Sequence, residues 1–188
     1  MDTLKGHWEG LYKAKAPTQV SWYQPHLERS LALVSRAGLR HDASIIDIGG
    51  GASTLVDDLL ARGFTHMTVL DISGEALRVA KARLGIRADD VRWVEADVIE
   101  AALPQHGYDL WHDRAVFHFL TDADKRHQYV GVLRRALRVE GQMIMATFGV
   151  NGPPRCSGLE VVRYNPETLQ AELGKEFRNL ERISSFYR

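Results

Sequence analysis

Three glycines and a following aspartate are the residues whose types and spacing could bind a ligand. Gly49, Gly50 and Gly51 lie between an apolar run at residues 45–48 and a helical pattern, and Asp71 follows. Glycines at a strand-to-helix turn leave room for a ligand to approach the backbone. A carboxylate about 20 residues further on can accept hydrogen bonds from both hydroxyls of a ribose. We therefore expect a nucleotide-like ligand over the glycine loop.

Two further aspartates stand at or near the ends of predicted strands. Asp47 precedes the glycines, and Asp97 is followed by Val98. The Asp97 carboxylate could accept from the exocyclic amine of an adenine, and the Val98 N–H could donate to a ring nitrogen. A single strand-end aspartate is usually a solvated charge or a helix cap. Three aspartates beside one glycine loop favour a ligand site.

The glycine loop does not match the motifs that bind phosphate-bearing nucleotides. A dinucleotide fingerprint needs Gly-x-Gly-x-x-Gly, and Thr54 occupies its third glycine position. No tyrosine has a lysine four residues on, as a short-chain dehydrogenase would require, and no Gly-Lys-Ser/Thr of a phosphate loop is present. These absences weaken the case for a dinucleotide or a nucleoside triphosphate.

Apolar runs of strand type alternate with helical patterns along most of the chain. This alternation predicts an α/β fold with a mostly parallel sheet, and right-handed crossovers place helices on both of its faces. The three aspartates then share the carboxyl-end rim of the sheet. Strands are predicted at residues 45–48, 67–70, 91–94, 108–112, 142–148 and 180–187, and helices at 27–38, 54–62, 74–85, 122–138 and 166–174.

Residues 1–26 form an aromatic-rich N-terminal segment before the main domain at residues 27–188. Trp8, Tyr12, Trp22 and Tyr23 stand among polar neighbours in a predicted short helix and loop. They either anchor the segment on the core or form a lid over the ligand. Residues 149–158, which include Gly152, Pro153 and Pro154, are expected to be an irregular loop.

The composition is typical of a globular protein. The 188 residues are 45% hydrophobic and carry 24 basic and 24 acidic side chains, which gives no support for a nucleic-acid or membrane-surface partner. A single cysteine, Cys156, excludes an intrachain disulfide framework and a cysteine zinc cluster. The start of the chain is no signal peptide and no run is long enough to span a membrane, so we expect a cytoplasmic protein.

The order and spacing of these motifs resemble class I S-adenosylmethionine-dependent methyltransferases over roughly residues 40–150. Residues 47–53, Asp-Ile-Gly-Gly-Gly-Ala-Ser, look like that family's Asp-x-Gly-x-Gly motif. The resemblance implies a Rossmann-like fold and S-adenosylmethionine as cofactor, with S-adenosylhomocysteine as product. The residues expected to bind the cofactor are Asp47, Gly49, Gly50, Gly51, Asp71, Ile72, Asp97, Val98, Asp113, Arg114 and Trp22.

The resemblance implies methyl transfer by in-line displacement, which needs positioning of two reactants more than a catalytic triad. His118, between two phenylalanines after the fourth strand, is our candidate for proton removal from the acceptor. His112, Asp113 and His118 lack a clear metal-ligand spacing, so no metal is expected. Arg155 could hold an anionic acceptor or be a solvated loop residue.

The acceptor is expected to be a small molecule, with a protein lysine as the alternative. The N-terminal aromatic residues also resemble a branch with lysine methyltransferases of citrate synthase and elongation factor 1A. Two other functions stay open: a non-catalytic module that senses the cofactor or its product, and a nicotinamide oxidoreductase. An open acceptor cavity favours the enzyme, and a cavity filled by Phe117, His118 or Trp22 favours the module. The sequence does not predict an oligomeric state.

The chain departs from the family pattern at its C-terminus. The family's sheet usually ends in a seventh, antiparallel strand beside the fifth. The sequence stops at Arg188, just after the predicted strand at 180–187, in which Ile183 is the best core candidate. We therefore expect either a shortened sheet or a trimmed chain.

Overall fold

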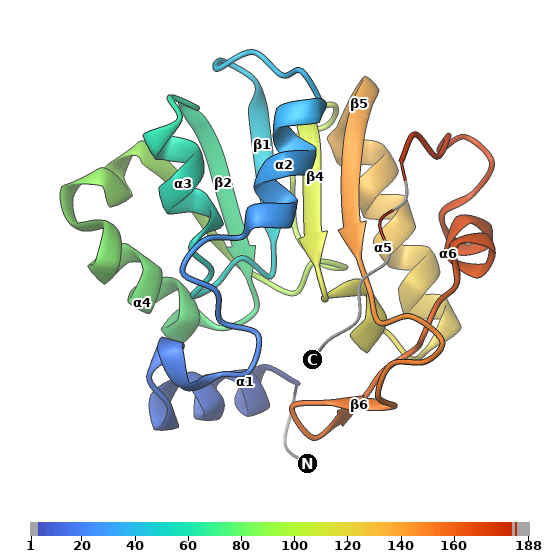
Figure 1. Cartoon of the computed structure of the whole chain (residues 1–188), viewed down its shortest axis with the longest axis horizontal. Coiled ribbons are helices and arrows are strands. Elements are labelled where there is room, and N and C mark those ends of the chain that lie inside the picture. Colours follow the sequence, from blue (N-terminus) through green and yellow to red (C-terminus); the bar gives the residue numbers. More distant parts are fainter. Residues whose placement is uncertain (1–3, 182, 184–188) are drawn as a thin grey trace.

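Five parallel strands form the central sheet, in the order β3-β2-β1-β4-β5 (Figure 1). The computed structural model describes residues 4–181 and 183. The chain runs outward from β1 to β3 and then crosses back to β4, so the strand order reverses between β1 and β4. Open α/β sheets bind ligands at this reversal, beyond the carboxyl ends of the strands. The strands are β1 Ser44–Ile48, β2 His66–Asp71, β3 Val91–Glu95, β4 Tyr108–Arg114 and β5 Leu137–Ala146.

Helices cover both faces of the sheet, as the alternating pattern predicted. Successive residues of β1 show the division: Ile45 packs in a cluster with α2 and α3, whereas Ile46 packs in a cluster with α5. A strand buried on both faces reads as a continuous apolar run, because neither face meets water. No described helix is long and apolar enough to cross a membrane. The helices are α1 Leu4–Ala14, α2 Glu28–Arg36, α3 Leu55–Ala61, α4 Gly74–Leu84, α5 Ala123–Ala136 and α6 Pro166–Leu173.

Polar side chains define where three of these helices begin. Ser73 Oγ accepts from the Ala76 N–H at 3.1 Å, and Asp122 caps α5 in the same way. Asn165 accepts from the Thr168 N–H at 2.7 Å, with Pro166 at the first helical position. Each cap satisfies backbone donors that would otherwise lack partners.

The largest boundary error lies between α5 and β5. The sequence predicted a helix to residue 138 and a strand from residue 142, but α5 ends at Ala136 and β5 begins at Leu137. Leu137 pairs with Tyr108, and the next pair joins Gln142 to Leu110. The pairing register therefore shifts there, and Glu140 adopts a φ of 63°. A strand that bulges around several polar residues cannot be recognised from apolar periodicity.

The segment expected to be an irregular loop contains part of a β-hairpin. β6 (Arg155–Cys156) pairs with β7 (Leu159–Glu160) in antiparallel register. Ser157 and Gly158 between them have φ values of 51° and 80°. Two consecutive residues with positive φ are typical of the tight turns that join paired strands. In Figure 1 this hairpin lies beyond the carboxyl ends of the strands, beside α1.

The expected strand at 180–187 is not confirmed by the residues that can be described. Leu180 and Glu181 have no strand conformation, and Leu180 is 69% exposed. Ile183 is 48% exposed, so it is not a core residue. The rest of this prediction lies outside the described residues.

Candidate functional site

The glycine loop after β1 wraps around two carboxylates. Gly49 has a φ of 64°, a conformation that favours glycine, and its N–H donates to the Leu70 carbonyl at 2.7 Å. A Cβ added at Gly50 would collide with the Asp47 carboxylate, and one at Gly51 would collide with the Asp71 carboxylate. The loop therefore needs glycines to pass so close to both acids.

Asp71 ends β2 with its carboxylate held beneath the loop. Its Oδ1 accepts from the Ser73 N–H at 2.8 Å, and the Gly51 N–H also donates to it. Burial raises the pKa of Asp71 to about 7, against the lowering by these two donors. A carboxylate fixed in this way, at the rim where the ligand is expected, is preorganised to accept from a diol.

One cavity of about 400 Å³ opens at the carboxyl ends of β1, β2 and β4. Its volume lies in the range typical of small-molecule sites. Nine of the residues predicted to bind the cofactor line it. They are Trp22, Asp47, Gly49, Gly50, Asp71, Ile72, Asp97, Val98 and Arg114.

Aromatic side chains from the N-terminal segment lie over this cavity. The ring centroid of Trp8 is 6.0 Å from Trp22 and 5.3 Å from Phe119, in edge-to-face geometry. The Trp22 indole hydrogen-bonds the hydroxyl of Tyr12, which lies close enough to Asp71 for the carboxylate to raise the pKa of Tyr12 further above the effect of burial. These four aromatic residues line the cavity together.

Helix α1, which carries Trp8 and Tyr12, is also attached to the domain through polar side chains. It has no buried residue of its own. Glu9 accepts from the Glu75 N–H at 3.2 Å at the start of α4, where the helix dipole favours a negative charge. Lys5 forms an ion pair of 2.5 Å with Glu95 at the end of β3.

Asp113 and Gly51 do not line the cavity, although both were predicted to bind the cofactor. Asp113 is fully buried, and it accepts from the Val116 N–H at 2.8 Å and the Tyr129 hydroxyl at 2.5 Å. Burial raises the pKa of Asp113 to about 6. The structure therefore places Asp113 behind the cavity, where it fixes the loop after β4. Gly51 contributes its small size to the packing of Asp71 rather than a cavity surface.

His118, predicted to remove a proton from the acceptor, is also outside the cavity lining. It is fully buried between the rings of Phe119 and Phe148, at centroid distances of 4.5 and 4.7 Å. Its Nδ1 accepts from the Phe148 N–H at 3.3 Å, and burial lowers its pKa to about 4. Direct proton transfer would require the ring to turn out of this position, so its catalytic role stays a prediction.

The buried imidazole of His118 should make the protein sensitive to acid. Its pKa falls from 6.5 to about 4 on folding, so the unfolded chain binds the proton more tightly and stability decreases as pH falls from 6.5 to 4. This group alone contributes up to about 3 kcal/mol across that range. We expect urea unfolding of His118→Leu to show a shallower pH dependence than wild type. His127→Leu, which replaces an exposed histidine, should leave the slope unchanged. Equal slopes for all three proteins would contradict the assignment.

His112 and Ser30 belong to the surroundings of the site, and the sequence did not predict this role for either residue. His112 lines the cavity with its Nδ1 2.7 Å from Asp47 Oδ1. Its Nε2 lies 2.9 Å from Ser30 Oγ, on α2. The alternation of apolar and polar residues along β4 does not reveal these contacts, because Ser30, Asp47 and His112 are far apart in the chain.

Among the described residues, no group of three acidic, histidine or cysteine side chains could hold a metal ion.

The strand order, the glycine loop and the row of strand-end carboxylates around one cavity define a Rossmann-like domain that binds a nucleoside cofactor. A family model described as a methyltransferase domain matches residues 46–143. The chain belongs to this family, and it is a class I S-adenosylmethionine-dependent methyltransferase domain.

Curated relatives carry methyltransferase names with different acceptors. Human EEF1A lysine methyltransferase 2 is 21% identical over 155 residues, which cover 75% of this chain and 66% of that protein. Malonyl-[acyl-carrier protein] O-methyltransferase of Paenibacillus sp. is 29% identical over 132 residues, covering 66% of this chain and 46% of its own. The chain thus matches just under two-thirds of the length of the human relative.

Solved structures share the fold. Phosphoethanolamine N-methyltransferase 2 of Haemonchus contortus, crystallised with S-adenosylhomocysteine, superposes with a TM-score of 0.68 at 19% identity. The match covers 91% of this chain and 41% of that one. The cofactor of the present domain is S-adenosylmethionine. Its residues fit that group, since Asp47 Oδ2 is buried with no partner among the described residues and lies beside a loop that only glycines can form.

Proposed function

We propose that the protein transfers a methyl group from S-adenosylmethionine to a small-molecule acceptor. The observation that carries the acceptor class is the enclosure of the cavity. Trp8 and Trp22 cover it on one side, while Phe148, Arg155 and Cys156 line it from the region of β5 and β6. A cavity that side chains of the same chain partly cover suits an acceptor small enough to fit inside it.

The strand-end residues provide the binding contacts for the cofactor. In the proposed arrangement, Asp71 accepts from the ribose hydroxyls, and Asp97 and Val98 contact the adenine. The Asp47 carboxylate accepts from the ammonium group of the cofactor's methionine arm. S-adenosylmethionine supplies a methyl group that is already activated by a positively charged sulfur. The chain therefore has to hold two reactants in line and exclude water.

We assign the acceptor to the half of the cavity that Phe148, Arg155 and Cys156 line. The residues around this acceptor half support catalysis over a purely sensing role. Phe117 and His118, which would have filled it in a non-catalytic module, are both fully buried behind its lining. Trp22 lies at the wall, where Arg114 donates to its carbonyl oxygen at 3.1 Å. Arg155 lines the same half and is paired with Glu160 at 3.5 Å. In the proposed arrangement, the part of the cavity beside these residues receives the acceptor.

A protein lysine is the second candidate acceptor. The observation that favours it is the name of three relatives, the EEF1A lysine methyltransferase 2 proteins of human, mouse and zebrafish, at 21–25% identity. For a lysine to be methylated, the covering aromatic residues would have to leave a channel for a single extended side chain.

The two acceptor classes are separated by fractionating a cell extract. The protein is incubated with S-adenosylmethionine carrying a deuterated methyl group and either the low-mass or the protein fraction. We expect mass spectrometry to find the label in a low-mass compound and not in protein. Label in protein alone would establish the second candidate. The variant Asp71→Ala, which should bind cofactor poorly, is the control for enzyme-dependent transfer.

The placement of α1 predicts a measurable response to the cofactor. Because α1 buries no residue of its own and covers the cavity, a ligand beneath it should add contacts that the free protein lacks. We expect hydrogen exchange in residues 4–24 to slow at least threefold with saturating S-adenosylhomocysteine, whereas exchange in α5, remote from the cavity, stays the same. Unchanged exchange in both segments would reduce the aromatic residues to anchors.

A further inference from the structure

A buried chain of three polar side chains runs from the cavity to α2. His112 Nδ1 lies 2.7 Å from Asp47 Oδ1, and its Nε2 lies 2.9 Å from Ser30 Oγ. The exposed fractions of Asp47, His112 and Ser30 are 2%, 1% and 7%. Polar groups at this depth are retained only when hydrogen bonds satisfy them. The imidazole is thus fixed on both of its nitrogens.

The order of these three side chains relative to the cavity excludes Ser30 as a nucleophile. In a serine hydrolase the hydroxyl faces the substrate and the carboxylate lies behind the histidine. Here Asp47 and His112 line the cavity, and Ser30 does not. The Asp47 carboxylate is therefore the group that can contact a ligand, and His112 and Ser30 hold it in place.

One oxygen of Asp47 has no hydrogen-bond partner among the described residues. Oδ2 is buried, and no hydrogen bond to it exists among the residues that the structure describes. It lies beside Gly50, where a Cβ would contact it at 2.5 Å. A buried carboxylate oxygen without a donor is costly, and a cationic donor supplied by a ligand would remove that cost.

We propose that His112, fixed by Ser30, is a positioning residue that aims the free oxygen of Asp47 at the ammonium group of the cofactor's methionine arm. This inference rests on the proposed function. His112 occupies Oδ1 and restrains rotation of the carboxylate about its Cβ–Cγ bond. The remaining oxygen then stays directed to the glycine loop, and α2 becomes part of the support of the cofactor site.

Two amide substitutions separate positioning from general stability. The amide nitrogen of His112→Asn stands as many bonds from Cα as Nδ1, so it can still donate to Asp47. The nitrogen of His112→Gln stands one bond further, as Nε2 does, and loses that contact. Calorimetry measures the affinity of each protein for S-adenosylhomocysteine and for 5′-methylthioadenosine, which lacks the ammonium and carboxylate groups. The readout is the ratio of the two affinities.

The ratio is the affinity for S-adenosylhomocysteine divided by the affinity for 5′-methylthioadenosine. We expect His112→Gln to lower it tenfold or more, mainly by weakening the binding of S-adenosylhomocysteine. His112→Asn should keep it within about threefold of wild type. Ser30→Ala should lower the ratio about threefold, and Ser35→Ala, on the same helix but bonded to the Leu31 carbonyl, should not change it. Equal affinity ratios for the Asn and Gln variants would overturn the proposal. An equal loss of affinity for both ligands in the Gln variant would do so as well. Failure of the wild type to bind either ligand would instead refute the proposed function.

Discussion

Asp71→Ala should lower the affinity for S-adenosylhomocysteine ten- to a hundred-fold. The carboxylate lines the cavity and is held in place by the Ser73 N–H, so it is preorganised to accept from the two ribose hydroxyls. Hydrogen bonds to a charged group of this kind contribute roughly 1.5–3 kcal/mol. Calorimetric titration measures the change. Asp124→Ala removes an exposed carboxylate outside the cavity and should bind as wild type does.

The same assignment predicts how binding depends on pH. Burial raises the pKa of Asp71 to about 7, so the carboxylate is ionised at pH 8 and mostly protonated at pH 6. If the ionised form accepts from the diol, affinity should fall by up to about tenfold between pH 8 and pH 6. Asp71→Asn cannot titrate and should remove this dependence. A pH dependence that survives in the Asn variant would assign the titration to another group.

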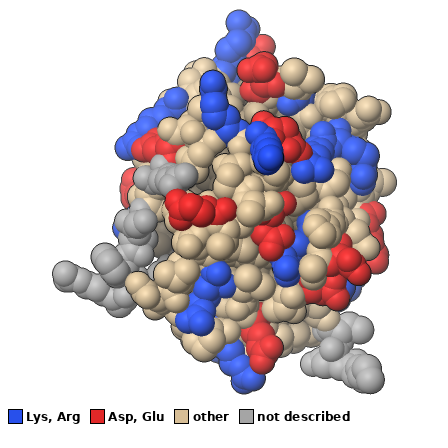
Figure 2. All heavy atoms as spheres, turned by 90° about the vertical axis from the view of Figure 1, so that its right-hand side faces the viewer, with Lys and Arg blue, Asp and Glu red and all other residues tan. Residues whose placement is uncertain are grey.

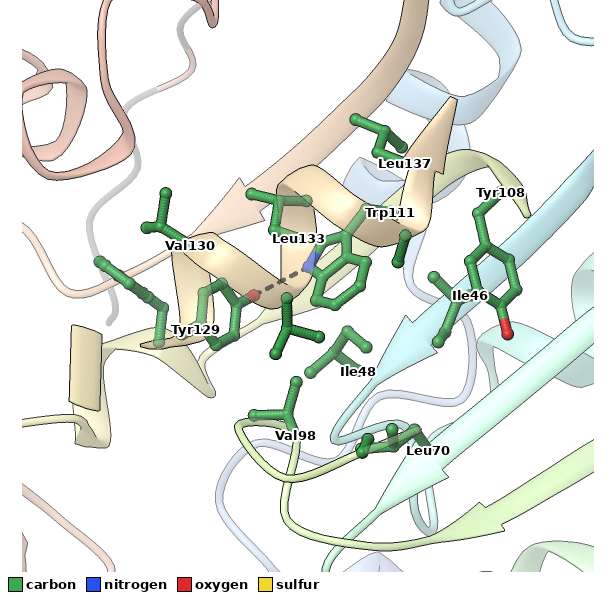
Figure 3. Packing of buried hydrophobic residues seen from close by; sticks show 14 of the residues in the cluster. Ile46, Ile48, Leu70, Val98, Tyr108, Trp111, Tyr129, Val130, Leu133 and Leu137 are labelled. Carbon is green, nitrogen blue, oxygen red and sulfur yellow. Dashed lines mark hydrogen bonds between the residues drawn. The ribbon is translucent and has the colours of Figure 1, made fainter. Parts of the chain in front are cut away.

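Trp111→Ala should destabilise the domain by about 3–5 kcal/mol. Trp111 is fully buried in the cluster of Figure 3, where its indole N–H donates to the Tyr129 hydroxyl at 2.8 Å. The substitution leaves a large cavity and removes a donor from the Tyr129 hydroxyl, which still donates to Asp113. Urea unfolding followed by circular dichroism measures the loss.

Trp93→Ala is the matched control for this prediction. Trp93 lies on the edge strand β3, is only partly buried and has Lys81 Nζ 5.5 Å from its ring centroid. Because part of its surface already faces water, its truncation should cost about half as much or less. Equal losses for the two tryptophans would contradict the view that the cluster around Trp111 carries the stability of this face of the sheet.

Much of the fold could be predicted because local chemistry and global structure agree along the first half of the chain. The apolar run at Ile45 and Ile46, the cap at Ser73 and the stop at Gly85 each contain their own signal. After Tyr108 this agreement weakens. β5 bulges at Glu140, and Leu180 stays exposed, since neither position follows a simple period.

The site was predictable where it depends on position along a strand and not where it depends on side-chain direction. Asp47, Asp71 and Asp97 stand at or near strand ends, and all line the cavity. Asp113 also comes near the end of its strand, but its side chain turns inward to the Val116 N–H. His112 contacts Asp47 across neighbouring strands, a contact that depends on the pairing of β1 with β4. Sequence spacing alone contains no information about such pairings.

The surface view in Figure 2 shows basic and acidic side chains interspersed over the face that carries α5 and α6, in keeping with 24 residues of each sign. An interspersed surface of this kind gives little long-range steering of a charged molecule. Under the proposed function, selection among acceptors should therefore depend on short-range contacts within the cavity, which Phe148, Arg155 and Cys156 line.

The attachment of α1 has a consequence for biosynthesis. This helix precedes its partners in the chain, since Glu75, Glu95 and Phe119 lie 66 or more positions after the residues that they contact. Its full set of contacts can form only after β4 has been synthesised, because Phe119 follows that strand. In the proposed arrangement, a nascent chain that ends soon after Asp71 should retain the cofactor weakly, because α1 cannot yet cover the cavity. Under the proposed function, tight cofactor binding by a nascent chain should therefore require synthesis beyond β4, and not only of the part that contains Asp47 and Asp71.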